Sequence, residues 1–196
     1  MSSRKRYPVR IPRSVSGIRA QESRAGSGRS WWLRRWMEII EGMGLGGRLG
    51  RGKSYAVSGQ IVSMEIDGNR VLAKVVGTRP DPYEVTVDFR EPSDEAKARI
   101  VAKLKAEPML VARLLVDELP LEVEEIFRAE GCHLFPGGKL GPGKYDMTTK
   151  CSCPDYANPC KHTSAVLVIL GEQISRRPAT LVELRGISME ELCDEA

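Results

Sequence analysis

Four potential metal ligands lie within twelve residues of the C-terminal part of this chain. Cys151 and Cys153 are two positions apart, Cys160 and His162 are two positions apart, and the six residues PDYANP separate the pairs. Three thiolates and one imidazole are a common tetrahedral ligand set for zinc. Because four protein ligands fill the coordination shell, we expect Zn²⁺ as the cofactor and a structural role for it.

Other chemistry at this cluster is less consistent with its spacing. Cys151 and Cys153 do not have the Cys-x-x-Cys spacing of thiol oxidoreductases. A ligand set that contains histidine is explained more simply by zinc than by an iron–sulfur cluster. A group of free buried cysteines beside a chance histidine is the remaining alternative. Elsewhere, Cys132 is expected in a packed turn and Cys193 stands alone in an acidic segment.

The sequence offers little material for catalysis. It contains only two histidines, one of them in the cysteine cluster, so a histidine-based triad is disfavoured and we expect no enzyme. Residues 47–54, GRLGRGKS, match the phosphate-binding loop pattern, but that loop needs a strand before it and a helix after it. Here we predict a helix before it and a strand beginning near Tyr55, which argues against nucleotide hydrolysis.

Basic residues dominate the start of the chain, although the net charge is only +4. Residues 1–53 hold 13 Lys and Arg against three acids, whereas residues 54–196 hold 17 against 23. Residues 1–29 combine arginine with Ser, Gly and Pro and have too few apolar groups to fold alone, which predicts a basic flexible arm. A solvated tail that binds nothing is the alternative interpretation of this segment.

Arginine suits bidentate contacts with phosphate, and such contacts release counterions and make binding sensitive to salt. The arm and a flexible glycine-rich loop at residues 47–54 are therefore the expected contacts with nucleic acid. The candidate nucleic-acid-binding residues are Arg4, Lys5, Arg6, Arg10, Arg13, Arg19, Arg48, Arg51 and Lys53.

The elements that must position these groups follow from hydrophobic periodicity. Trp31–Glu41 has helical spacing with Ser30 as a plausible N-cap. Three strands are expected, within residues 55–66, 70–77 and 83–89, with a turn at 67–69 between the first two. Helices are then expected at residues 94–107, 109–119, 121–130 and 163–174, with a glycine-rich loop over 134–150 and two short helices near the end.

These elements predict an α+β fold: a small antiparallel β-meander followed by helices and a zinc finger, with a basic extended N-terminal arm. We divide the chain into the arm at 1–29, an α+β domain at 30–131, and a region at 132–196 with the loop, the zinc finger and the last helices. The longest apolar run has six residues, far short of the roughly 20 that span a membrane.

The cellular setting is indicated only by composition. No apolar region follows the basic N-terminus, so we expect no secretory signal. Five cysteines, three of them clustered, favour a reducing compartment, so we expect a cytoplasmic protein without a membrane partner. Asn and Gln together number only five, which hints at a thermophilic source.

The Cys-x-Cys-x6-Cys-x-His pattern resembles the SWIM-type zinc finger, and the wider sequence is similar to a prokaryotic family of SWIM-finger proteins. The stretches that carry this resemblance lie between Gly28 and Ile187 and include GRSWWLRRWMEIIE, RGKSYAVSGQIV, GTRPDPYEVTV, LPLEVEEIF, LFPGG and CSCPDYANPCKHTSAV. The resemblance implies that Cys151, Cys153, Cys160 and His162 bind zinc. It also implies DNA or protein binding, since family members are often encoded near helicase-like remodelling ATPases.

We therefore expect a non-enzymatic nucleic-acid-binding component of a nucleoprotein complex, with DNA and RNA both open. One alternative is a ribosome- or RNA-associated protein anchored by its arginine-rich arm. The other is an adaptor that binds a helicase-like remodelling ATPase through its acidic helical part.

Overall fold

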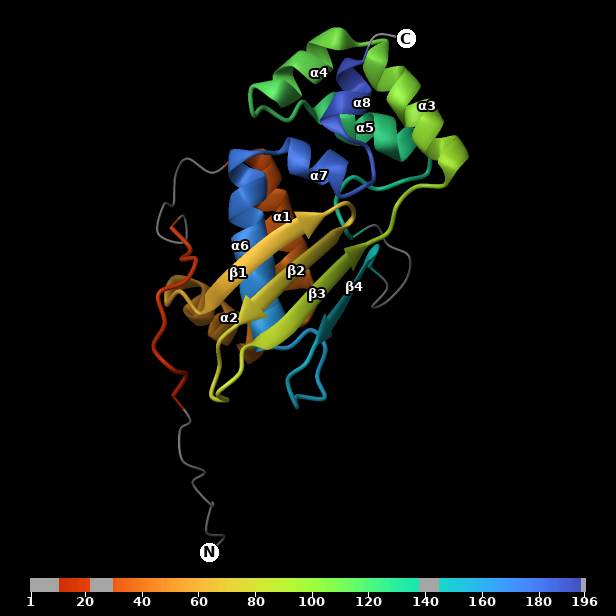
Figure 1. Cartoon of the computed structure of the whole chain (residues 1–196). Helices are drawn as coiled ribbons and strands as arrows, with labels where there is room; N and C mark the ends of the chain where they lie inside the picture. The colour runs from red at the N-terminus through yellow and green to blue at the C-terminus, as the bar shows by residue number, and fades with distance from the viewer. Residues whose placement is uncertain (1–10, 22–29, 138–144, 195–196) are drawn as a thin grey trace, which may run out of the picture.

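The computed structural model describes residues 11–21, 30–137 and 145–194, which form an α+β fold (Figure 1). Its centre is an antiparallel four-stranded sheet in the order β1-β2-β3-β4. The strands are β1 (Ile61–Asp67), β2 (Arg70–Val75), β3 (Tyr83–Phe89) and β4 (Met147–Cys151). The predicted fold class is confirmed.

The sheet buries one face, and the alternation along its strands shows which side chains form that face. On β2 and β3 every second residue is buried, so the opposed pairs Val71–Val87 and Ala73–Val85 point into the core. Leu72 and Lys74, between them, lie on the open face. The strands are rich in valine, which suits a half-buried pleated surface.

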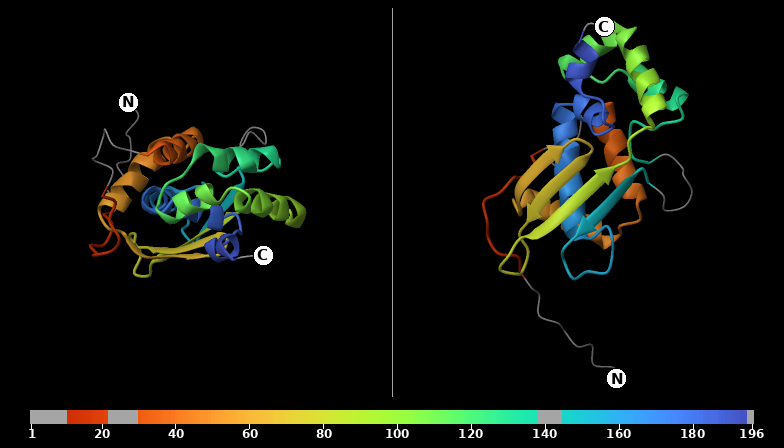
Figure 2. Two further views of the ribbon diagram at one scale, coloured as in Figure 1. Left: turned by 90° about the horizontal axis from the view of Figure 1, so that it is seen from above. Right: turned by 45° about the vertical axis from the view of Figure 1, so that its right-hand side comes forward.

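The buried face of the sheet is covered by α6 (Lys161–Arg176), and α1 (Trp31–Gly42) and α2 (Gly47–Val57) pack against α6 (Figure 2). α6 is the central element, since its residues 162–172 are all buried. The indole of Trp36 on α1 is fully buried and donates a hydrogen bond from Nε1 to the carbonyl of Leu167, 3.0 Å away. Trp36 is therefore a core residue that joins α1 to α6.

A second group of helices forms a lobe at the opposite end of the sheet from the loop that joins β4 to α6 (Figure 1). We call it the helical lobe, and it consists of α3 (Asp94–Lys105), α4 (Pro108–Leu115), α5 (Leu121–Ala129) and α8 (Met189–Cys193). The chain enters α3 from β3, and it enters α8 from α6 through α7 (Ala179–Glu183). Ser93 caps α3, because its hydroxyl accepts from the amide of Ala96 at 3.3 Å. The helices of this part of the chain were predicted.

Arg185 ties the helical lobe to the sheet. Its side chain is 2% exposed, and its guanidinium donates from Nε to the carbonyl of Leu134 at 3.1 Å and from Nη1 to that of Arg90 at 2.7 Å. Burial lowers the pKa of Arg185 to about 10, so the group keeps its charge at neutral pH.

Residues 47–57 differ from their prediction. We expected a flexible basic loop followed by a strand near Tyr55, but these residues form α2. Three glycines give this segment a low helix propensity, yet Gly52 lets its backbone pack against α6, where a Cβ would lie 2.5 Å from the Cβ of Ser164. Burial of Tyr55 and Ala56 then favours the helix over a strand.

Two further expectations need correction. The predicted loop at 134–150 contains most of β4, which pairs with β3. The sheet therefore includes strands from both sides of residue 131, where we had divided the α+β domain from the zinc-finger region. Residues 11–21, which we assigned to a flexible arm, are held along β1 and α2. Their amides at Gly17 and Ile18 donate to the carbonyls of Gly59 and Ile61 at 3.0 and 2.7 Å. This part of the arm is therefore an ordered extended segment on the surface, and of residues 11–21 only Ala20 is buried.

Candidate metal centre

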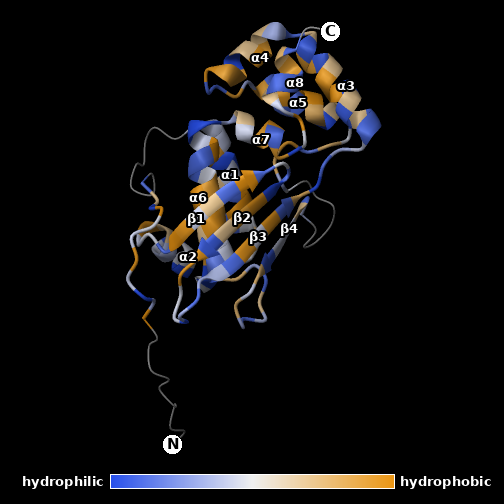
Figure 3. Cartoon of the chain, in the orientation of Figure 1, coloured by the Kyte–Doolittle hydropathy of each residue, from blue (hydrophilic) through white to orange (hydrophobic). Residues whose placement is uncertain are grey.

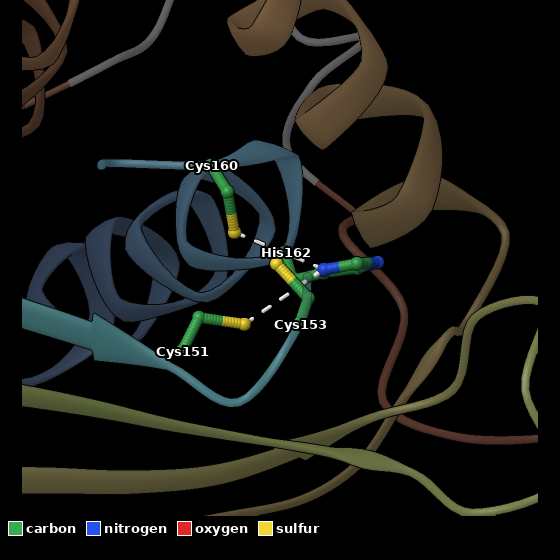
Figure 4. Close-up of side chains that lie close together, drawn as sticks. All are labelled: Cys151, Cys153, Cys160 and His162. Carbon is green, nitrogen blue, oxygen red and sulfur yellow. Dashed lines mark hydrogen bonds between the residues drawn. The ribbon is translucent and has the colours of Figure 1, made fainter. Parts of the chain in front are cut away.

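The four predicted metal ligands converge at the junction between β4 and α6 (Figure 4). Cys151 is the last residue of β4, Cys153 lies in the loop that follows, Cys160 is the N-cap of α6 and His162 lies in its first turn. The ligand atoms of all four lie within 4.8 Å of one another. The short spacing within each pair thus places two ligands at the end of β4 and two at the start of α6.

The four ligand atoms are close enough to share one tetrahedral zinc ion, provided that separations of up to 4.8 Å shorten when the ion binds. Nδ1 of His162 lies 3.8 Å from Sγ of Cys151 and 3.8 Å from Sγ of Cys160. A tetrahedron with Zn–S bonds of about 2.3 Å and Zn–N bonds of about 2.0 Å has edges of roughly 3.5–3.8 Å. Zinc bound here would carry four protein ligands and would crosslink the end of the sheet to the central helix.

One thiol of the cluster is poised to be a thiolate. The hydrogen bond with Cys151 lowers the pKa of Cys160, and bonds with His162 and Thr163 lower it further. The same hydrogen bond with Cys160, together with burial, raises the pKa of Cys151. Cys160 also lies at the N-terminus of α6, where the helix dipole favours negative charge. These hydrogen bonds and the position at the start of α6 therefore favour the thiolate form of Cys160.

Aromatic rings fix the orientation of His162. The side chain is 4% exposed, and its imidazole lies 4.4 Å from the ring of Tyr83 and 5.4 Å from that of Tyr55, centroid to centroid. Nε2 is buried without a hydrogen-bond partner among the described residues, whereas Nδ1 faces the sulfur atoms. The packing thus presents one nitrogen, Nδ1, to the metal.

The loop between the two ligand pairs is held from both sides. The Asn158 amide donates to the carbonyl of Thr149 at 2.6 Å and accepts from its hydroxyl at 2.7 Å. On the other side, Ser152 exchanges two hydrogen bonds of 2.9 Å with the backbone of Glu84 on β3. These contacts, none of which involves a ligand side chain, hold the ligand loop against β3 and β4.

Cations surround the metal centre. The guanidinium of Arg79 lies 5.9 Å from the centroid of Tyr83, and the ammonium of Lys161 lies 5.0 Å from that of Tyr55. Arg13 donates to the carbonyls of Gly77 and Pro80, in the connection that also carries Arg79. We call this end of the molecule the zinc pole, and it comprises the ligand loop 152–159 with Arg13, Arg79, Lys161 and Tyr156.

The other predicted nucleic-acid contacts are more dispersed. Arg19 is exposed on the segment along β1, Arg48 and Arg51 lie on α2, and Lys53 forms a 3.0 Å ion pair with Glu41. The amides of the phosphate-loop pattern at 47–54 belong to a helix, so they do not form a phosphate-binding loop. Arg4, Lys5, Arg6 and Arg10 lie outside the described residues.

Tyr156 was not among the predicted site residues. Its side chain is 98% exposed in the ligand loop, between the two pairs of ligands, which leaves an aromatic ring open to solvent. In the sequence its neighbours Asp155, Ala157 and Asn158 indicate only a turn, so its exposure could not be inferred from them. Cys132 and Cys193 do not join the cluster in the part of the chain that the structure describes.

The tryptophans have structural roles. Trp31 packs on Phe135 and donates from Nε1 to the carbonyl of Leu119 at 3.0 Å. Trp32 donates to the carbonyl of Ser175 at 3.3 Å. Both side chains therefore hold α1 in place.

Among the described residues, no helix combines the length and hydrophobicity needed to cross a membrane.

Comparisons with known proteins agree with this geometry. Residues 143–171 match the family model described as SWIM zinc finger, a range that contains all four candidate ligands. The chain is also 36% identical over 193 residues to the uncharacterized protein Rv2102 of Mycobacterium tuberculosis, an alignment that covers 98% of this chain and 68% of the relative. No solved structure matches the chain. On its ligand set, its geometry and this similarity over nearly the whole chain, the chain belongs to the SWIM-type zinc finger protein family.

Proposed function

We propose that this protein is a non-enzymatic, zinc-stabilised component of a nucleoprotein complex and that it binds nucleic acid through the zinc pole. The observation that carries the proposal is the arrangement of Arg79 and Lys161 around the metal centre. Each cation lies over an aromatic ring, Tyr83 or Tyr55, that itself contacts the imidazole of His162. Zinc would therefore fix the positions of both cations and leave their charges available to phosphate.

Tyr156 adds a second kind of contact. The Tyr156 side chain is 98% exposed, so almost none of its surface packs against the protein and the ring is free to stack on an unpaired base. Stacking of a base on an aromatic side chain contributes about 1–3 kcal/mol. A flexible single strand could thus use the ring and the cations together, whereas a duplex would engage the cations alone.

The basic arm extends this interface in the sequence. Arg13 is bound at the zinc pole through the carbonyls of Gly77 and Pro80. Arg4, Lys5, Arg6 and Arg10 precede it by at most nine residues. Phosphate contacts by these residues would add affinity that falls steeply with salt.

Fluorescence anisotropy of the zinc-loaded chain against duplex DNA, single-stranded DNA and structured RNA over a range of salt tests the proposal. We expect the double variant Arg79→Ala/Lys161→Ala to weaken binding and to reduce the salt slope by about two, one for each lost phosphate contact. The matched control is Arg113→Ala/Arg128→Ala, which removes two exposed cations from the helical lobe. Equal effects of the two double variants, or none, contradict the proposal.

The same titrations distinguish between a DNA-binding protein, an RNA-binding protein and an adaptor that binds neither. A preference for duplex DNA supports a role in remodelling or recombination, and salt-resistant binding to RNA alone supports a ribosomal or other ribonucleoprotein component. We expect Tyr156→Ala to weaken binding to single strands more than to duplexes and Tyr156→Phe to retain it. Absence of binding to all three nucleic acids at physiological salt would leave the adaptor for a helicase-like ATPase as the better proposal.

A further inference from the structure

The helical lobe carries an apolar groove at the end of the molecule away from the zinc pole. The groove lies between α4 and α8 and has a volume of about 500 Å³. Four of its lining residues, Pro108, Val111, Ala112 and Leu115, follow one another at the i, i+3, i+4, i+7 spacing of a single helix face. The remaining lining residues are Leu192 and Cys193 of α8, with Lys105 and Asp194 at one end.

Large apolar side chains in and beside this groove are exposed to solvent. Leu115 is 56% exposed, and Met109 and Val116, its neighbours on or just after α4, are 70% and 69% exposed. Figure 3 shows hydrophobic residues along α4 at the outer side of the lobe. Burying such side chains is favourable by about 25 cal/mol for each Å² removed from water. Grouped exposed apolar residues of this kind mark interaction surfaces.

The charges around the groove are mainly acidic, with Lys105 as the cation that lines it. Residues 94–131 and 188–194, which contain the helices of the lobe, hold 12 acidic and six basic residues, whereas the rest of the chain is basic. Glu107 immediately precedes α4 and Asp117 follows it by two residues, and neither has a cation within 4.0 Å among the described residues. Asp194 lies at the same end as Glu107 and uses its carbonyl, not its carboxylate, to accept from Lys105 at 2.9 Å.

We propose that this groove docks an amphipathic α-helix of a partner protein that presents aliphatic side chains over about two turns and Lys or Arg at both ends. α4 has eight residues and is therefore about 12 Å long, which matches the apolar face of two helical turns. Glu107 and Asp117, neither of which forms an ion pair within 4.0 Å among the described residues, lie beyond the two ends of that face, and Asp117 also attracts Arg177 at longer range. They would meet the flanking cations of the bound helix, so the charges favour a basic partner helix over an acidic one.

This surface is distinct from the proposed nucleic-acid interface. The helical lobe and the zinc pole lie at opposite ends of the sheet (Figure 1). A partner protein on the lobe would leave Arg79, Lys161 and Tyr156 accessible. The chain would then connect a nucleic acid at one end to a protein at the other, and the docking inference stands or fails independently of nucleic-acid binding.

Titration of the full-length, zinc-loaded protein with a synthetic peptide tests this inference. The peptide is a helix with leucine at positions i, i+3, i+4 and i+7 and two lysines at each end. Binding is followed by backbone amide chemical shifts in α4 and α8. One comparison peptide has glutamate in place of every lysine, and another has the same composition with the leucines moved off a common face. We expect the lysine-flanked peptide to bind at least about tenfold more tightly than either.

Two variants locate the site. Leu115→Lys should weaken the lysine-flanked peptide at least about tenfold, because it removes apolar surface and adds a like charge. Leu72→Lys on the open face of the sheet, where the leucine is 39% exposed, is the matched control and should not change binding. Each of the following outcomes overturns the proposal: no shifts in α4 and α8, equal binding of the glutamate peptide, or self-association of the protein that Leu115→Lys abolishes.

Discussion

Gly77 lies against the imidazole of His162, and the neighbouring ring of Tyr83 leaves no room there for a side chain. A Cβ at residue 77 would lie 3.3 Å from Nε2 of His162 and 2.5 Å from Cε2 of Tyr83. The connection between β2 and β3 therefore holds one edge of the imidazole, while its other nitrogen, Nδ1, faces Cys151 and Cys160. The position of the nitrogen ligand depends on a glycine that lies far from the ligand loop in sequence.

This contact predicts that Gly77→Ala weakens metal retention. The added methyl group must displace the ring of Tyr83 or of His162, and overpacking of this kind costs about 1–3 kcal/mol. Zinc release to a chromogenic chelator should therefore be faster than in the wild type, and the melting temperature of the zinc-loaded protein should fall. A zinc release rate equal to that of the wild type would show that the imidazole does not depend on the glycine.

The packing of α2 on α6 predicts opposite effects for two substitutions in one helix. Gly52→Ala should destabilise the protein, since its Cβ would lie 2.5 Å from the Cβ of Ser164. Gly50→Ala, two residues earlier, meets nothing within 4 Å and should stabilise the helix by up to about 1 kcal/mol. Chemical denaturation of both variants checks this pair. Stabilisation by both substitutions would mean that α2 does not pack on α6 as described.

The glycines of α2 also show where sequence-based prediction failed. In isolation a segment with three glycines and three basic residues has a weak preference for helix, and its pattern favours a loop. Its conformation is decided by α6, which is more than 100 residues away in sequence. By contrast, the helices of the lobe have strong local periodicity and caps, and their positions could be predicted to within a few residues.

The hydrogen bonds of Glu130 predict that part of the protein's free energy of unfolding is lost in acid. Hydrogen bonds from Arg99 and then Lys103 lower the pKa of its carboxyl below the ordinary value, and these bonds are 2.6 and 2.5 Å long. Because the folded state holds this proton less tightly than the unfolded state, the stabilisation is complete above the ordinary pKa of about 4.5 and is lost as the pH falls through the lower folded value.

The substitution Glu130→Gln should therefore lower the melting temperature at pH 7 and have a smaller effect in the acid range. The measurement is the difference between wild type and variant at each pH, so that loss of zinc by both proteins in acid cancels. A difference that stayed constant with pH would show that the carboxylate charge makes no contribution.

Removal of the metal should affect the core and not the ligand loop alone. The N-terminus of α6 carries two ligands, and α6 is buried over residues 162–172. Because zinc binding to such sites is coupled to folding, a chelator should lower the melting temperature and increase hydrogen exchange along α6 as well as at residues 151–160. Increased exchange confined to 151–160 would show that the loop is an independent unit.

The candidate site itself was largely predictable, for a local reason. Its four ligands lie within twelve residues, so their spacing carries most of the geometry. What the sequence did not reveal is the surroundings: β4, whose five residues form a strand only by pairing with β3, the aromatic contacts of His162, and the exposure of Tyr156. Each of these depends on segments distant in sequence.

The central claim is that Cys151, Cys153, Cys160 and His162 together bind one zinc ion. Titration of the metal-free protein with Co²⁺ tests it most directly, because tetrahedral cobalt with thiolate ligands absorbs strongly in the visible range, whereas octahedral cobalt absorbs weakly. We predict a tetrahedral, thiolate-rich spectrum that saturates at one equivalent, reverses with Zn²⁺, is lost in Cys160→Ser and is retained in Cys132→Ser and Cys193→Ser. A weak octahedral spectrum, or the same spectrum from Cys160→Ser, would contradict the claim.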